Sequence, residues 1–253
     1  MDALMHVDNA GDGTPESVWQ AWGGFDALPE LRPDALVPLL GRAVFVAPHP
    51  DDEVLGMGGL MVKLARLQRK LALVAVTDGD ASHRDSPVWT PARLREERPV
   101  ETREALQRLR AFNVEVTRLR HTDGKVSQSE SLLREQLMQM LDPADVVITT
   151  WRFDGHPDHE SAGRAAAAAC LSTGATLVEV PIWTWHWATP EDTHLPWGRA
   201  RRLTLDASTL GRKRHATQSF ASQLTDDPST GQPAVLGAEV LAHLLRPFEI
   251  FFV

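Results

Sequence analysis

Two short segments of the chain concentrate residues that can hold a metal ion. The segment PHPDDE contains His49 and Asp52, three residues apart, and the segment DGHPDHE contains His156 and His159 at the same spacing. Each segment follows an apolar run and carries a proline suited to the first position of a helix, so each is predicted to join a strand to a helix. At such a junction, residues three apart can converge on one side.

This convergence predicts a particular chemistry. Two imidazoles and one carboxylate around a tetrahedral cation, with a fourth position left for water, describe a catalytic zinc site. Bound zinc brings the pKa of its water near neutrality and polarises a carbonyl, which makes amide hydrolysis feasible. A nearby unligated carboxylate could take the water's proton, and a further imidazole could stabilise the oxyanion or protonate the leaving amine. One such residue alone would more simply cap a helix, so it is the pairing of two clusters that favours a metal site.

The elements that must position these residues alternate along the chain. Strands are predicted at 42–47, 71–77, 114–120, 145–151, 175–183, 201–206 and 248–253. Helices are predicted at 54–69, 127–141, 158–171, 208–222 and 235–245, with a broken helix at 92–111. Alternation of this kind indicates βαβ units and a parallel sheet, and continuously apolar strands indicate that helices cover both faces.

The expected fold is therefore α/β, a doubly wound, mainly parallel sheet with helices on both faces (Rossmann-like), in a single domain. We place this domain at 41–253, after an irregular N-terminal extension at 1–40 with one short helix near 15–22. In such sheets the ligand crevice lies beyond the carboxyl ends of the strands. Both histidine segments fall at such ends.

Composition narrows the class of partner. A net charge of -8 and a pI near 5.7 disfavour a general nucleic-acid or anionic-membrane binder. The single cysteine, Cys170, cannot form an internal disulfide, and the first residues lack the basic start and apolar core of a signal peptide. We therefore expect a cytoplasmic protein acting on a small molecule, with no nucleic acid and no membrane as partner, and with a homo-oligomer possible.

The two segments resemble the marks of the PIG-L/LmbE-like family of zinc-dependent deacetylases, a PHPDDE-type loop and a later HPDH-type loop. The resemblance extends from about Arg42 into the C-terminal third of the chain. Its other supports are an R-x-x-E-x-x-x-A pattern and a K-x-x-A segment that ends in Ser-Gln, at Arg98, Glu101, Ala105, Lys213, Ala216, Ser222 and Gln223.

The resemblance implies roles for individual residues. His49, Asp52 and His159 would be the zinc ligands, and Asp51 would be the general base. The remaining implied roles are His156 as the transition-state partner, Asp158 as the group that orients His156, and Glu53 as a support of the ligand loop.

One position departs from the family pattern. Some members have a tyrosine two residues before His156, whereas this chain has Asp154 and contains no tyrosine. A carboxylate cannot stabilise an oxyanion unless it is protonated, so Asp154 is predicted to bind substrate or to shape the loop.

Other residues could contact a sugar. The segment PIWTWHWATPEDTHLPW supplies Trp183, Trp185, Trp187 and Trp197 as an aromatic wall, although alternating tryptophans more often pack a core, and His186 is expected to be structural. The candidates for substrate binding are Asp80, His83, Arg84, Arg98, Asp154 and Trp185.

The function expected from the resemblance is removal of an N-acetyl or similar small N-acyl group from an amino sugar or sugar conjugate, with Zn2+ as cofactor and Fe2+ possible. The residues alone support only metal-assisted amide hydrolysis, so a zinc amidase acting on another N-acyl metabolite is an alternative. A dinucleotide-binding oxidoreductase is disfavoured because Met61 replaces the third glycine of the motif. A non-catalytic sugar-binding module is a further alternative.

Overall fold

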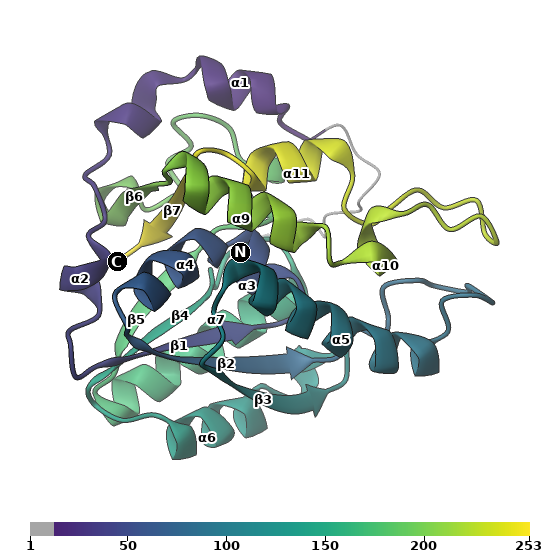
Figure 1. The fold of residues 1–253 in the computed structure, drawn as a ribbon, viewed down its shortest axis with the longest axis horizontal. Coiled ribbons are helices and arrows are strands. Elements are labelled where there is room, and N and C mark those ends of the chain that lie inside the picture. The colour runs from purple at the N-terminus through teal and green to yellow at the C-terminus, as the bar shows by residue number, and fades with distance from the viewer. Residues whose placement is uncertain (1–12) are drawn as a thin grey trace.

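Seven strands form one sheet in the computed structural model, which describes residues 13–253. The strand order is β3-β2-β1-β4-β5-β7-β6 (Figure 1). The strands from β3 to β5 are parallel, whereas β7 is antiparallel to both of its neighbours. The strands are β1 (Arg42–Ala47), β2 (Lys70–Thr77), β3 (Val114–His121), β4 (Asp145–Thr150), β5 (Thr176–Val180), β6 (Ala200–Thr204) and β7 (Phe248–Phe252).

Helices cover both faces of this sheet. Figure 1 shows α4 (Gly58–Arg66), α5 (Pro91–Leu109) and α9 (Ala207–Thr217) on one face, and α6 (Glu130–Met140) and α7 (Pro157–Thr173) on the other. The remaining elements are α1 (Glu16–Ala21), η1 (Gly23–Ala27), α2 (Pro33–Leu36), α3 (Asp52–Leu55), η2 (Val126–Ser129), α8 (Thr184–Trp187), η3 (Trp197–Arg199), α10 (Ala221–Leu224) and α11 (Ala238–Leu244). This arrangement confirms the predicted single-domain, doubly wound α/β fold.

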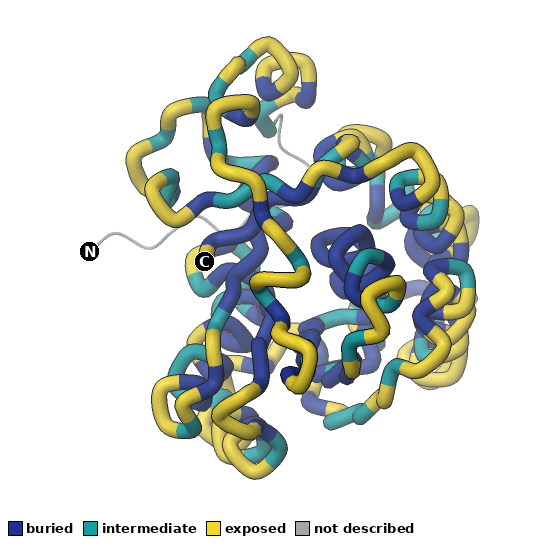
Figure 2. Tube along the Cα trace, turned by 60° about the vertical axis from the view of Figure 1, so that its left-hand side comes forward, coloured by how far each residue is buried: buried dark blue, intermediate teal, exposed yellow. Residues whose placement is uncertain are grey.

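The apolar strands are explained by two cores. Along β1, Phe45 packs into one hydrophobic cluster, whereas Val44 and Val46 pack into the other on the opposite face. Because successive side chains of a strand point to opposite faces, a strand buried on both sides has to be apolar throughout. Figure 2 shows the central strands buried and the exposed segments on the outside of the molecule.

Three predicted helices differ from the observed ones. The helix predicted at 208–222 is interrupted, because α9 ends at Thr217 and the short α10 begins at Ala221. The single helix predicted at 54–69 is wrong, because the chain forms α3 and then restarts as α4, whose first amides, at Gly59 and Leu60, donate to the carboxylate of Glu249. The predicted break within 92–111 is also wrong. Helix α5 is continuous through Pro99.

The segment before the sheet is packed onto it. Residues 13–40 contain α1, η1 and α2 instead of one short helix, and Trp19 of α1 is fully buried and donates its indole N–H to the carbonyl of Trp185 at 2.9 Å. Residues 1–12 of the predicted extension lie outside the described residues, and the domain boundary at residue 41 stays a prediction. No helix within 13–253 combines the length and apolar character needed to cross a membrane.

Candidate metal centre and catalytic cleft

The site lies where the strand order reverses. Strands β1 and β4 are neighbours in the sheet, but β1 connects onward to β2 and β4 connects onward to β5, in opposite directions. The loops that leave two such strands diverge and open a crevice at their carboxyl ends. His49 follows β1, and His156 and His159 follow β4, so the topology brings the two histidine segments together.

Three atoms at this crevice form a nearly equilateral triangle. His49 Nδ1 and His159 Nε2 each lie close to Asp52 Oδ2, at 3.4 and 3.3 Å, and the two ring nitrogens are 3.3 Å apart. Ligand atoms about 2.0–2.1 Å from a tetrahedral zinc ion are about 3.3 Å apart. The donor set and its spacing therefore fit a single tetrahedral cation.

The outer nitrogens of both rings face carboxylates. His159 Nδ1 lies 2.8 Å from Asp154 Oδ2, and His49 Nε2 lies 3.2 Å from Asp123 Oδ1 and 3.3 Å from Asp158 Oδ2. A carboxylate that accepts the proton of the outer nitrogen leaves the inner nitrogen with a free lone pair. This arrangement selects the tautomers that present His49 Nδ1 and His159 Nε2 to a metal.

A second group of possible ligands shares one of these rings. His49 Nε2, Asp123 and Asp158 lie close enough together to hold a cation. The two carboxylates are also hydrogen-bonded to backbone amides: Asp158 accepts from Gly124 and Val126, and Asp123 accepts from Ala81. Because the triangle supplies two imidazole nitrogens and one carboxylate, the donor set of a catalytic zinc site, we favour it as the metal position.

Asp51 is held in an unusual conformation beside the triangle. Its φ is 133°, a region that side chains rarely adopt, and such strain concentrates at functional sites. The guanidinium of Arg98 donates to Asp51 Oδ2 at 3.0 Å and to the carbonyls of Pro50 and Gly79. Burial raises the pKa of Asp51 to about 8, against the lowering effect of Arg98. The predicted substrate contact Arg98 therefore holds the predicted base.

Buried charges set the protonation of the histidines. Burial by itself lowers the pKa of His159, but Asp52 and Asp154 outweigh it and raise the pKa to about 9. The same balance, with Asp123 as the strongest partner, raises the pKa of His49 well above its usual value. Both rings thus lie in a strongly negative environment that would equally attract a metal cation.

His156 differs from the other two histidines. Burial and then the positive charges of His159 and His49 lower the pKa of His156 to about 3. Its Nδ1 accepts the backbone N–H of Asp158 at 3.2 Å, so the neutral ring carries its proton on Nε2. Asp158 thus contacts His156 through its backbone N–H, whereas its carboxylate contacts His49 and the amides of the loop after β3.

Two predicted substrate contacts, Asp154 and Trp185, are buried away from the cleft, and the structure fits the other alternative given for Asp154, that it shapes the loop. Asp154 is fully buried, and its carboxylate is used by His159 and by the segment that follows β5. Trp185 packs edge-on against Trp19 in the hydrophobic core.

The other predicted contacts lie on the loop after β2. Asp80 pairs with Arg95 at 2.7 Å, His83 bonds Ser82 at 3.0 Å, and Arg84 is exposed. None of the three lines the cleft among the described residues. Their neighbours Ala81 and Ser82 do line it.

The cleft above the triangle has a volume of ≈ 280 Å³. Its polar side carries Asp51, Arg98, Asp123 and the three histidines, and Trp183, Gln223 and an apolar group of residues from the C-terminal part of the chain complete it. Asp123 and the apolar group were not predicted. Asp123 could have been found, because it follows β3 at the same edge of the sheet.

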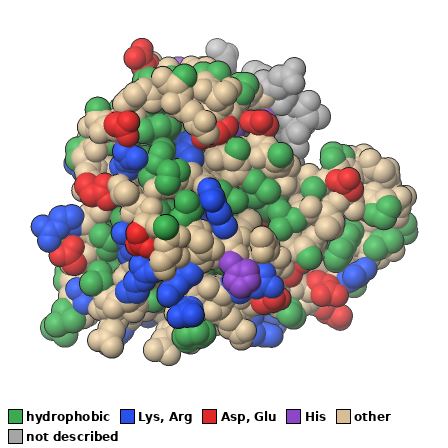
Figure 3. All heavy atoms as spheres, turned by 45° about the horizontal axis from the view of Figure 1, so that its top comes forward, with side chains coloured by type: hydrophobic (Ala, Val, Ile, Leu, Met, Phe, Trp, Pro, Cys, Tyr) green, Lys and Arg blue, Asp and Glu red, His purple; other side chains and the backbone are tan. Residues whose placement is uncertain are grey.

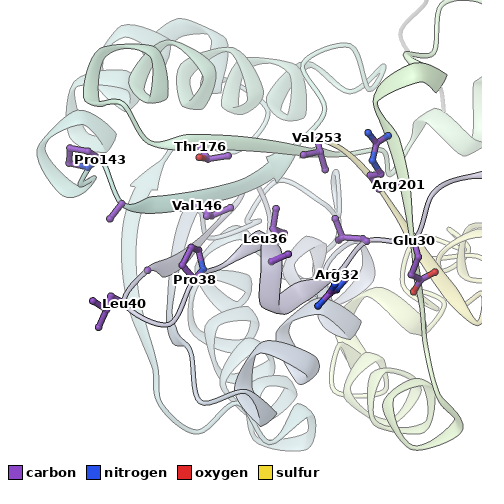
Figure 4. A pocket seen from close by; sticks show the side chains of 14 residues that line it. Glu30, Arg32, Leu36, Pro38, Leu40, Pro143, Val146, Thr176, Arg201 and Val253 are labelled. Atoms are coloured by element: carbon purple, nitrogen blue, oxygen red, sulfur yellow. The ribbon is translucent and has the colours of Figure 1, made fainter.

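A larger hollow of ≈ 770 Å³ lies at the opposite edge, where β1, β4 and β5 begin (Figure 4). Its charged groups are engaged, since Glu30 accepts from Thr204, and Arg201 donates to the carbonyls of Gly198 and Ala200. The smaller cleft is therefore the better candidate for chemistry. On the face seen in Figure 3, positively and negatively charged side chains are interspersed with hydrophobic ones.

Fold and site together define an α/β protein with a candidate single-metal centre at the switch point of its sheet. The family model described as "PIG-L: GlcNAc-PI de-N-acetylase" matches residues 44–170, which include both histidine segments. The chain belongs to this family.

Other proteins are similar to this chain in sequence or in fold. Diacetylchitobiose deacetylase of Thermococcus kodakarensis (strain ATCC BAA-918 / JCM 12380 / KOD1) is 27% identical over 130 residues, which are 48% of this chain and 46% of that protein. The match thus spans less than half the length of this curated relative. Among solved structures, a zinc-inhibited form of teicoplanin deacetylase Orf2 has a TM-score of 0.64 at 17% identity, covering 83% of this chain and 97% of that one. The N,N'-diacetylchitobiose deacetylase from Pyrococcus horikoshii has a TM-score of 0.54 at 22% identity, covering 74% and 72%.

Proposed function

We propose that this protein is a metal-dependent hydrolase that removes an N-acetyl or similarly small N-acyl group from an amino sugar or sugar conjugate. The observation that carries the proposal is the triangle of His49 Nδ1, Asp52 Oδ2 and His159 Nε2, with Asp51 beside it. The family description and the names of the similar proteins are those of deacetylases, which supports the sugar substrate.

His49, Asp52 and His159 would hold the metal. Zinc suits two imidazoles and a carboxylate, and ferrous iron accepts the same donors. When bound, the dication would polarise the acyl carbonyl, promote ionisation of a water molecule and lower the pKa of Asp51.

Asp51 acts as the general base in this proposal. Its carboxylate, held by Arg98, takes a proton from the attacking water as the new carbon–oxygen bond forms. When the carbon–nitrogen bond breaks, the same proton passes to the departing amine. The products are the free carboxylate and the amino sugar, so one water is consumed for each amide cleaved.

His156 acts as a neutral donor. Because its pKa is lowered to about 3, the ring is uncharged at neutral pH and offers the Nε2–H to the developing oxyanion. This favours oxyanion stabilisation over protonation of the amine. Asp154 serves the ligand His159 and is buried away from the cleft, whereas Asp123 contacts the ligand His49 and also lines the cleft.

The oxidoreductase alternative is weakened by the start of α4. A pyrophosphate at a helix N-terminus needs free backbone N–H groups. The amides of Gly59 and Leu60 are already bonded to Glu249, at 2.6 and 2.9 Å. Turnover of an amide separates the sugar-binding module from the main proposal, and the identity of the amide that is cleaved separates the zinc amidase from it. The cytoplasmic location and the possible homo-oligomer stay predictions.

The test is amine release from N-acetylglucosamine conjugates by the zinc-loaded protein. Asp51→Asn should lower kcat at least about 100-fold, because the variant loses the proton acceptor, while zinc content measured by metal analysis stays the same. Asp142→Asn, an exposed aspartate before β4, is the matched control and should be fully active. Full activity of Asp51→Asn would refute its role as base. Absence of amine release from a broad sugar panel would remove the sugar assignment.

A further inference from the structure

One side of the cleft is apolar although the metal side is strongly polar. Leu55 of α3, Ile182 after β5, and Val240 and Leu244 of α11 line it together with Val235 and Leu236 from the loop before α11. We call these six residues the apolar wall. The apolar wall lines the same cavity as the ligand triangle. A group of the substrate that contacts the wall therefore also lies near the bond that is cleaved.

From this juxtaposition we infer that the substrate carries an apolar group next to the amide that is cleaved. The inference rests on the proposed function and narrows its substrate class. Sugar hydroxyls buried against a wall without hydrogen-bonding partners lose their bonds to water, which is costly. An alkyl or aromatic group placed there instead gains free energy by leaving water.

The loop that supplies Val235 and Leu236 is held in place by hydrogen bonds. The N–H of Leu236 donates to the carbonyl of Gln223 at 2.9 Å, and the N–H of Ala234 donates to Asp226 at 3.0 Å. A β-bridge joins Asp227 to Gln232. These bonds order the loop part of the wall without a ligand, so binding does not have to order it.

The size of the cleft limits the group. A volume of ≈ 280 Å³ is near the lower end of small-molecule sites, which span roughly 300–1,000 Å³. Such a space encloses the reacting sugar and a small apolar substituent, while the rest of a large conjugate stays outside. The substituent can be a lengthened acyl chain or an apolar aglycone, which share the same chemistry.

Two substrate series distinguish these sources on the zinc-loaded protein. One series is N-acetyl-, N-butyryl- and N-hexanoylglucosamine, and the other is the methyl, hexyl and phenyl glycosides of N-acetylglucosamine. We expect kcat/KM for amine release to rise about tenfold or more within one series, as is usual for added methylenes in an apolar pocket. Amine release with no rise in either series overturns the inference and leaves the proposed function intact. No release from any member defeats both.

Variants of the wall connect the preference to the structure. Val240→Asn should lower the ratio of kcat/KM between the largest and smallest members of the preferred series about tenfold. Ala242→Asn, on an exposed position of the same helix, is the matched control and should keep the ratio. If Val240→Asn fails to fold by circular dichroism, Val235→Ser in the preceding loop replaces it. An unchanged ratio in a folded wall variant contradicts the inference.

Discussion

Asp154 shows how much one buried carboxylate can organise at the scale of the residue. It accepts five hydrogen bonds, which come from the His159 ring, the amides of Ile182, Trp183 and Thr184, and the Thr184 hydroxyl. The loop after β4 is thereby fastened to the segment after β5. The same carboxylate orients the ring of His159, so the direction of His159 Nε2 depends on these hydrogen bonds.

Asp154→Asn should weaken zinc binding about 10- to 100-fold, the usual effect of losing the partner of a metal-bound histidine. An asparagine has one acceptor oxygen, and its amide nitrogen would face N–H donors. Competition with a chromophoric chelator measures the affinity, and Asp142→Asn again serves as the control. Wild-type affinity in the folded variant would show that Asp154 does not orient the ligand.

The sequence predicts the convergence of His49, Asp52 and His159 because each lies next to an apolar strand, and parallel strands end at one edge. The sequence does not predict that Asp154 orients His159 and holds the segment after β5, since the direction of a loop side chain depends on contacts with segments distant in the chain. The same is true of Arg98, which lies 47 residues from Asp51 and reaches it only because α5 folds back over the sheet. The roles given to the site residues remain proposals.

At the scale of the element, α4 depends on a cap from far along the chain. The carboxylate of Glu249 on β7 accepts the first amides of α4, and the ammonium of Lys213 on α9 pairs with it at 2.7 Å. All of these groups are buried. Since α3 begins within the PHPDDE segment and α4 follows α3 directly, this pair also supports the elements next to the ligands.

Lys213→Met should lower the free energy of unfolding by about 3–5 kcal/mol, because it leaves a buried carboxylate without its cation. The double variant Lys213→Met/Glu249→Gln should lose less than the sum of the two single variants, since it leaves no unpaired charge. Denaturant unfolding followed by circular dichroism measures all three. Simple additivity would show that the pair is not coupled.

The elements themselves are largely predictable from apolar runs and turn residues, and all seven strands were expected. The break between α3 and α4 was not, because the amides that start α4 are satisfied by Glu249, 190 residues further on. The continuity of α5 across Pro99 was also missed. Pro99 has no N–H to donate to the carbonyl of Arg95. This carbonyl instead accepts a hydrogen bond from the Arg118 guanidinium at 3.5 Å.

At the scale of the whole molecule, the segment before the sheet packs against the C-terminal part of the chain. Glu16 of α1 is buried and forms an ion pair with Arg246, which follows α11, and Trp19 packs against Trp185 and Phe25. The apolar wall of the cleft is carried in part by α11. Residues 13–40 thus help to hold the C-terminal part of the domain against the sheet.

Trp19→Ala should cost about 3–5 kcal/mol of unfolding free energy, as expected for removing a fully buried large aromatic side chain. Val18→Ala, at an adjacent position that is 44% exposed, should change it by less than about 0.5 kcal/mol. Thermal and urea unfolding provide the comparison. Equal stability of the two variants would indicate that the segment packs only loosely.

The backbone at Asp51 bears on how this protein could be engineered. Glycine has no Cβ and adopts a positive φ such as 133° at a lower steric cost, but it has no carboxylate. Exchange of this aspartate for glycine would relieve the backbone strain but leave the buried guanidinium of Arg98 without its carboxylate, so the two effects on stability oppose each other. Directed evolution for heat resistance therefore has little to gain at this codon, where strain, ion pair and proposed base are a single residue.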